Sequence, residues 1–269
     1  MKNIYQYCGI VLILLLQTTA WAQNGERIAV SLSQPGQPGW LKVQLVTGSI
    51  EVSGYDGNEV IVDYQAPEDK NNRKGNPPDG MRRIPNDNFG LKIIEDDNKV
   101  EIKVDIPHKR TMIKVMVPRQ FSLKLGTVNN GDITVSNTRG EMEISNVNGS
   151  IFMKNVSGAV IANTVNGDLT VSFDQISADA PMSFTTLNGK VDVTLPSTAK
   201  ATARMSTLNG EIYTDFDLTL NNQGAKVNQS REDGVLRIEI DKQIYGEING
   251  GGAEMIFKSH NGDILIRKK

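Results

Sequence analysis

The stretch NGDITVSNTRGEMEISNVNGSIFMKNVSGAVIANTVNGDLTV, residues 130–171, contains a glycine at every ninth position. Each of these glycines, at positions 131, 140, 149, 158 and 167, opens a short run in which apolar residues alternate with others. The same unit returns as GKVDV at Gly189, GEIYT at Gly210 and GDILI at Gly262. Self-similarity at a fixed period predicts a repeat architecture, in which one structural unit is stacked many times.

The apolar residues of each unit have fixed places relative to its glycine. They lie two residues before it and two and four residues after it, as Val147, Ile151 and Met153 do around Gly149. Alternation with a period of two predicts a β-strand with one buried face, so all three positions are expected to point into the core. The positions expected to face outward carry Thr134, Glu143, Thr170, Asp192 and Tyr213.

The corner between strands is Asn-Gly in six units, at Asn130, Asn148, Asn166, Asn188, Asn209 and Asn261. Both residue types tolerate the positive-φ conformations of sharp turns. Asn-Gly is a strong signal for a two-residue hairpin, which would give an antiparallel β-meander. It also suits the corners of a solenoid. Because every unit repeats the same inward positions without reversal, the pattern favours an all-β, single-domain parallel β-solenoid with coils of about 18 to 22 residues; the β-meander is the alternative.

The repeat unit occurs near both ends of the chain, since Trp40 to Val52 carries it once around Gly48. No amphipathic helix pattern of useful length follows the first 22 residues. Residues 66–89 are rich in proline and charge, which predicts a mobile insertion. We therefore expect one adhesin-like β-solenoid domain over residues 23–269, interrupted at 66–89.

Residues 1–22 have the features of a secretory signal peptide. Lys2 precedes an apolar stretch from Ile10 to Leu16, and Ala20-Trp21-Ala22 is the small-x-small pattern that signal peptidase cuts. The chain is expected to be exported to the periplasm, the cell surface or the medium. The apolar stretch is shorter than the ~20 residues of a membrane-spanning helix, so no transmembrane segment is expected in the mature chain. Cys8, the only cysteine, would be removed with the signal peptide.

Two longer segments carry a resemblance to a known family. LKVQLVTGSIEVSGYDGNEVIVDY (residues 41–64) and VMVPRQFSLKLGTVNNGDITVSNTRGEMEISNVNGSI (residues 115–151), with the recurring Asn-Gly units, resemble the bacterial putative adhesin family. This family is a domain of unknown function found in exported or envelope proteins. The resemblance covers nearly all of the mature chain and implies a β-solenoid-like fold. The insertion at 66–89 departs from the family's pattern.

Residue types that carry chemistry occur without the spacing of a known site. His108 and His260 have no nucleophile or carboxylate at motif spacing, and Gly250-Gly251-Gly252 lacks the helix and lysine of a phosphate-binding loop. A formal net charge of −2 lacks the basic excess of a nucleic-acid-binding protein. We therefore predict no catalytic, cofactor-binding or metal-ligating residues, no cofactor and no nucleic-acid partner.

Acidic and polar residues could nevertheless form rows at stacked corners. A single glycine followed by an acid differs from the calcium-binding nonapeptide, so solvated turn acids are favoured over calcium ligands. Ordinary strand and corner formers are likewise favoured over a carbohydrate-binding ladder. The acids are Asp132, Glu141, Asp168, Glu211 and Asp263, and the outward polar residues are Thr134, Asn137, Thr164, Thr170, Thr186 and Thr207.

These observations favour an exported, non-enzymatic adhesin-like β-solenoid that presents a repetitive surface to an envelope or surface partner, either protein or glycan. A self-assembling envelope scaffold, and hence a homo-oligomer, is the first alternative. A polysaccharide-active enzyme that uses Asp132 and Asp168 is the less favoured one.

Overall fold

The computed structural model describes residues 26–65, 90–104, 110–221, 226–232, 235–241 and 243–269. The predicted signal peptide, the predicted insertion at 66–89 and His108 lie outside these residues. Within the described ranges every regular element is a β-strand, so no helix that could cross a membrane is found there.

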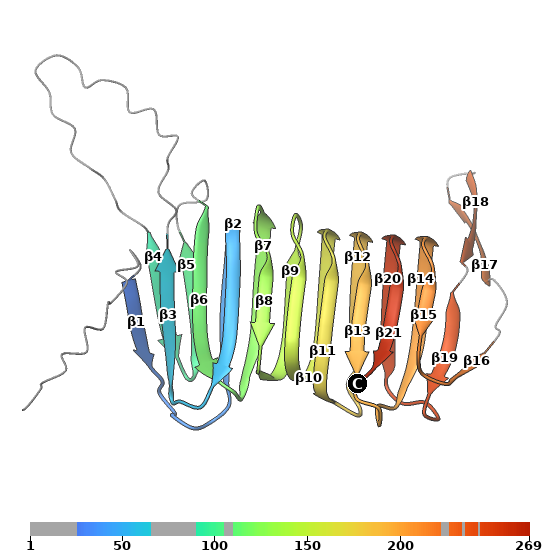
Figure 1. Ribbon diagram of the computed structural model, residues 1–269. Helices are drawn as coiled ribbons and strands as arrows, with labels where there is room; N and C mark the ends of the chain where they lie inside the picture. The colour runs from blue at the N-terminus through green and yellow to red at the C-terminus, as the bar shows by residue number, and fades with distance from the viewer. Residues whose placement is uncertain (1–25, 66–89, 105–109, 222–225, 233–234, 242) are drawn as a thin grey trace, which may run out of the picture.

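The strands have the following bounds: β1 Glu26–Ser31, β2 Gly39–Tyr55, β3 Glu59–Gln65, β4 Leu91–Asp96, β5 Lys99–Val104, β6 Thr111–Pro118, β7 Phe121–Asn129, β8 Ile133–Ser136, β9 Arg139–Asn146, β10 Ile151–Asn166, β11 Leu169–Ile176, β12 Met182–Asn188, β13 Val191–Leu195, β14 Ala201–Asn209, β15 Ile212–Thr214, β16 Leu218–Asn221, β17 Lys226–Glu232, β18 Val235–Asp241, β19 Ile244–Ile248, β20 Glu254–Asn261 and β21 Ile264–Lys268. Nineteen of them form one continuous sheet that winds into an elongated stack (Figure 1).

Each coil has two faces joined at the Asn-Gly corner. The leading face holds the strands that end at this corner, and the trailing face holds those that begin after it. Ile133, Ile151, Leu169 and Val191 are successive register partners on the trailing face, and all these pairings are parallel. Successive coils are 18 residues apart where β8, β10 and β11 stack, and 22 apart between β11 and β13. The predicted parallel β-solenoid is confirmed, with the predicted coil length.

Among the described strands, antiparallel pairing is confined to the two ends of the stack and to one hairpin. At one end β3 pairs in this way with β1 and with β6, and β4 pairs with β5; at the other end β19 pairs with β14 and with β16. β17 and β18 form a separate two-stranded sheet. The antiparallel β-meander is therefore wrong for the body of the molecule.

Two of the three predicted inward positions are confirmed. Ile151 and Met153, two and four residues after Gly149, are buried, but Val147, two residues before it, is 36% exposed. The alternation changes phase at the corner, because the last inward residue of β9 is Asn146 and the next is Ile151. Asn146 and Ile151 are five positions apart, an odd number, so strict alternation cannot continue through the corner. Val147, which follows the inward Asn146 directly, therefore points outward.

The order of coils in space differs from their order in the sequence. β2 lies between the coil of β5 and β6 and the coil of β7 and β8. The coil of β20 and β21, the last described strands, lies between the coil of β12 and β13 and the coil of β14 and β15 (Figure 1). The sequence pattern did not predict either intercalation.

Candidate functional site: the Asn-Gly corner

The corner glycines form a column along the stack, in the spatial order Gly48, Gly131, Gly149, Gly167, Gly189, Gly262 and Gly210. A Cβ on Gly167 would lie 2.2 Å from the carbonyl oxygen of Gly149, and one on Gly189 would lie 2.1 Å from that of Gly167. Gly149 and Gly167 are not among the described residues with positive φ, although Gly189 is, at φ 150°. The glycines are thus required chiefly because backbones approach closely, and the predicted positive φ is only part of the reason.

A row of inward polar side chains accompanies this column. Thr164 Oγ1 donates to the carbonyl oxygen of Gly149 at 2.8 Å, and Thr186 Oγ1 donates to that of Gly167 at 3.0 Å. Both threonines are buried, so the prediction that they face outward is wrong. Buried polar atoms need such partners, and the corner carbonyls supply them. The equivalent bond to the corner glycine of the neighbouring coil is made by Thr127, Asn146, Ser259 and Thr207.

Six asparagines, five of them exposed and one, Asn129, half-buried, form a hydrogen-bonded ladder on the outer side of the corner. The amide of Asn166 donates to Asn148 Oδ1 at 2.9 Å, and that of Asn188 donates to Asn166 Oδ1 at 2.7 Å. The ladder continues through the intercalated coil, since Asn261 donates to Asn188 and receives a bond from Asn209, both at 2.7 Å. In spatial order this asparagine ladder is Asn129, Asn148, Asn166, Asn188, Asn261 and Asn209.

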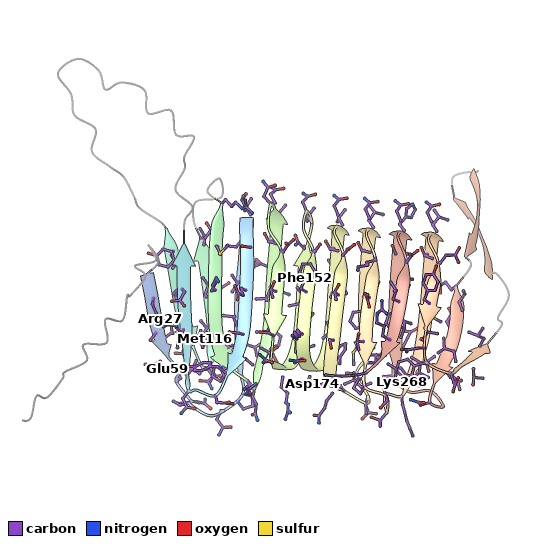
Figure 2. The ribbon with its side chains drawn as sticks, viewed as in Figure 1. Arg27, Glu59, Met116, Phe152, Asp174 and Lys268 are labelled. Atoms are coloured by element: carbon purple, nitrogen blue, oxygen red, sulfur yellow. The ribbon has the colours of Figure 1, made fainter. Side chains whose placement is uncertain are left out.

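An exposed apolar row runs beside the asparagine ladder. Its members lie two residues before the corner glycine, except Val128, which lies three before Gly131 but is level with Val46 and Val147 in the register, and they are 36–69% exposed. They are Val46, Val128, Val147, Val165, Leu187 and Leu208. His260 occupies the same row in the intercalated coil, between Leu187 and Leu208. Figure 2 shows side chains projecting along this upper edge of the stack, while Asp174 and Lys268 lie at the opposite edge.

Three of the five predicted acids, the aspartates, bond to the backbone of the neighbouring coil. Asp132 Oδ1 accepts from the Ser150 amide at 2.7 Å, and Asp168 Oδ1 accepts from the Lys190 amide at 2.9 Å. Asp263 accepts from the Glu211 amide in the same way. Ser150 separates Asp132 from Asp168 in the stack, so these two predicted alternatives for catalysis are not neighbours. Among the described residues no group of three or more His, Cys, Asp or Glu could hold a metal ion.

The remaining chemistry-bearing residues of the sequence also have structural places. Gly250 and Gly251 lie in the turn that leads into β20, with φ of 83° and 82°, and a strand follows them instead of a helix. Of the predicted outward polar residues, Thr134 and Asn137 are exposed and Thr170 and Thr207 are half-buried. The apolar row was missed, although its spacing was visible in the sequence, because it was assigned to the core.

Charged pairs link neighbouring coils on both faces, away from the corner. On the leading face Lys42 of β2 contacts Glu101 of β5 at 2.9 Å, and on the trailing face Lys114 of β6 contacts Glu51 of β2 at 3.1 Å. Lys103 also contacts Glu101, at 2.8 Å, but within β5 itself. The hydrogen bonds from Lys103 and then Lys42 lower the pKa of Glu101 from its ordinary value. These pairs are partly or fully exposed to solvent, so each contributes little to the free energy of unfolding.

These features define a parallel β-solenoid whose corner surface is made of an amide ladder and an apolar row that His260 interrupts. The family model Toastrack DUF4097 matches residues 111–267, and the chain belongs to this family, a domain of unknown function. The resemblance seen in the sequence is thereby confirmed.

Solved structures with distant similarity to this chain include two bacterial proteins. One is described as a putative cell adhesion protein from Clostridium sporogenes; it has 13% identity and a TM-score of 0.45, covering 91% of this chain and 99% of that one. The other is described as a putative adhesin from Bacteroides fragilis, with 10% identity and a TM-score of 0.35, covering 91% and 97%. A search of curated proteins finds no match.

Proposed function

We propose that this chain is an exported, non-enzymatic, adhesin-like protein that binds a repetitive partner of the cell envelope through its corner surface. The observation that carries the proposal is the pairing of the asparagine ladder with the exposed apolar row over successive coils. Neither feature is required to bury the core. Export is proposed from the signal-peptide pattern of residues 1–22.

The asparagine ladder leaves hydrogen-bonding capacity for a partner. Each amide has two N–H donors and a carbonyl oxygen with two lone pairs. An internal member such as Asn188 uses one N–H toward Asn166 and accepts one bond from Asn261. Asn166, Asn188 and Asn261 therefore each keep a second N–H and a second lone pair for a partner, at the ~4.8 Å spacing of neighbouring strands. Asn148 differs, because its amide group already donates to both Asn129 Oδ1 and the Val128 carbonyl oxygen.

The apolar row supplies the other half of the contact. Its side chains offer a narrow apolar strip directly beside the amides, so a partner with alternating apolar and hydrogen-bonding groups can meet both. Each coil contributes only a weak interaction, but a rigid stack holds many of them at fixed spacing, and the binding of one brings the next into place. The role of the corner acids in backbone hydrogen bonding also supports a binding function over a catalytic one.

The test is a binding comparison of two double variants of the mature chain. Val165→Asp with Leu187→Asp places two charges in the apolar row, and we expect binding to a purified envelope fraction to weaken by at least about tenfold in a sedimentation assay. Phe152→Asp with Ile161→Asp is the matched control, because these residues are 41% and 50% exposed but lie on the faces of the coils.

Circular dichroism would establish that both variants keep their β-structure. Equal loss of binding in both double variants, or full binding by the corner variant, would contradict the assignment of the corner as the contact surface. A parent chain that fails to bind any envelope fraction would contradict the proposed adhesin-like function itself.

A further inference from the structure

The coil of β20 and β21 fills a slot inside the stack. β20 pairs in parallel with β12 on one side and with β14 on the other, and β21 pairs in the same way with β13 and β15. Without this coil, four strand edges would face each other across an open gap. Unpaired edges of this kind bind another strand, so the slot is specific for one parallel coil.

The contacts across the slot are those of the rest of the core. Met255, Phe257, Ile264 and Ile266 are buried. The ring of Phe257 stacks on that of Phe184, with centroids 5.4 Å apart. The coil also supplies the Asn261 rung of the asparagine ladder.

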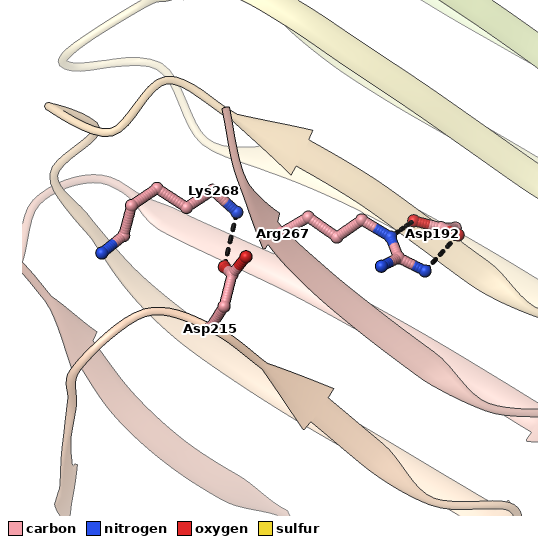
Figure 3. A network of polar contacts seen from close by, with 4 residues as sticks. All are labelled: Asp192, Asp215, Arg267 and Lys268. Carbon is pink, nitrogen blue, oxygen red and sulfur yellow. Dashed lines mark hydrogen bonds and ion pairs between the residues drawn. The ribbon is translucent and has the colours of Figure 1, made fainter.

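Polar groups at the opposite edge hold the coil on both sides (Figure 3). Arg267 Nε donates to Asp192 Oδ1 at 2.8 Å and its Nη2 donates to Oδ2 at 3.2 Å, which links β21 to β13. The backbone amide of Lys268 donates to Asp215 Oδ1 at 2.5 Å, next to β15. Every one of these contacts is made by residues 254–268 with the two walls of the slot.

One short turn connects β19 to this coil. Asn249, Gly250 and Gly251 all have positive φ, at 49°, 83° and 82°. The turn is tied down by Asn249 Nδ2, which donates to the carbonyl oxygens of Ser197 at 3.0 Å and Ala199 at 2.7 Å. The turn carries the chain from β19, on one side of β14, to β20 on the other. The other intercalated strand, β2, is held in place from both directions of the chain, because β1 before it and β3 after it are both paired in the stack.

We propose that the slot also accepts the coil of a second copy, so that two chains exchange residues 254–268 reciprocally. The exchanged dimer makes the same slot contacts as the monomer. Its stability relative to the monomer is set by protein concentration and by the turn at residues 249–251, which must open. The inference is independent of the corner surface and of any envelope partner.

The first test changes only the turn. Gly250→Ala with Gly251→Ala keeps the slot contacts but strains a left-handed conformation that glycine adopts freely, which raises the free energy of the closed monomer. We expect the dimer fraction after refolding at high concentration to rise by roughly tenfold or more, measured by size-exclusion chromatography with light scattering. Gly36→Ala is the matched control: its φ is 82°, and an added Cβ meets nothing within 4 Å.

The second test identifies the exchanged element in the full-length chain with Cys8→Ser. Ser206 on β14 and Lys258 on β20 are register partners. A copy with Ser206→Cys is refolded together with a copy carrying Lys258→Cys, and a disulfide between two chains can form efficiently only if β20 of one lies beside β14 of the other. Lys154→Cys in place of Lys258→Cys gives the background from random collision.

We expect the 206–258 cross-link to exceed this background with the wild-type turn and to increase with the alanine turn. Because the wild-type turn is tested too, the result does not depend on the turn variant folding. The proposal is overturned if cross-linking stays at background for both turns. It is also overturned if Gly36→Ala produces as much dimer as the turn variant.

Discussion

At the scale of single residues, glycine is needed for different reasons in the turn between β19 and β20 and in the Asn-Gly corner. At Gly250 and Gly251 the backbone has positive φ and an added Cβ has room, so the requirement is conformational. At Gly167 the backbone is outside the positive-φ region, but an added Cβ would lie 2.2 Å from the Gly149 carbonyl oxygen. An Asn-Gly pair therefore needs its glycine for backbone conformation at Asn249-Gly250 and for close packing of two backbones at Asn166-Gly167.

Gly167→Ala is expected to destabilise the protein strongly, by about 3 kcal/mol, because the carbonyl it would meet belongs to the backbone and cannot rotate away. Gly126→Ala is the control: its Cβ would lie 3.2 Å from the Ser145 hydroxyl, a side-chain atom that can move. We expect the control to stay within about 1 kcal/mol of the parent. Denaturant unfolding measures both, and equal free energies of unfolding would refute the steric explanation.

Glu95 links the connection between β1 and β2 to the turn between β4 and β5. The backbone amide of Ser33 donates to its carboxylate at 2.9 Å, and this bond, with those from the Ser33 hydroxyl and the Asn98 amide, lowers the pKa of Glu95 from its ordinary value of 4.5. Burial acts in the opposite direction but is outweighed. The unfolded chain then binds the proton more readily than the folded one, so this stabilisation is present above about pH 4.5 and is lost as the pH falls through the lowered pKa.

We expect acidification to increase hydrogen exchange around residues 32–38, at the end where β1 and β4 lie. Glu95→Gln should raise exchange there already at neutral pH and reduce the further response to acid. Glu143→Gln, a carboxylate in the middle of the stack, serves as the control and should leave the exchange of this end unchanged. The role given to Glu95 is contradicted if hydrogen exchange in Glu95→Gln responds to pH as it does in the parent, as the control is expected to do.

At the scale of elements, the place of a strand in the stack should decide its stability more than its place in the sequence. β20 and β21 have a strand on each side, whereas β16 lies at one end and, among the strands that the structure describes, is paired with β19 alone. We expect backbone amides of residues 255–266 to exchange as slowly as those of β12 and β13, and more slowly than those of β16, in native-state hydrogen exchange. Fast exchange across the coil would show that it frays as a terminal segment does.

At the scale of the whole molecule, the two intercalated coils connect parts of the stack that are far apart in the sequence. A solenoid in which each coil contacts only its sequence neighbours can lose coils one at a time from an end. Here the coil of β20 and β21 lies between two other coils, so its removal would leave β12 and β13 on one side, and β14 and β15 on the other, without their partners. Long-range pairing of this kind favours unfolding as one unit.

We therefore expect a single equilibrium unfolding transition. Trp40, on β2, reports the amino-terminal part of the stack by fluorescence, while far-UV circular dichroism reports β-structure throughout. The two curves should coincide in urea. Separate transitions would indicate that the two ends unfold independently, contrary to the linkage that the intercalated coils provide.

The sequence by itself determined the local structure of this protein. Strict alternation after each glycine assigned Ile133, Ile151 and Leu169 to one buried ladder, and the uniform register favoured parallel stacking, because these properties depend on neighbouring residues alone. The tertiary structure decided which coil lies beside which, and it turned Val147, Val165 and Leu187 outward. The coils share nearly the same pattern, so sequence similarity cannot specify their spatial order. That order is decided by filling the slot between β12 and β14, and the outward side chains follow from the corner path that stacking imposes.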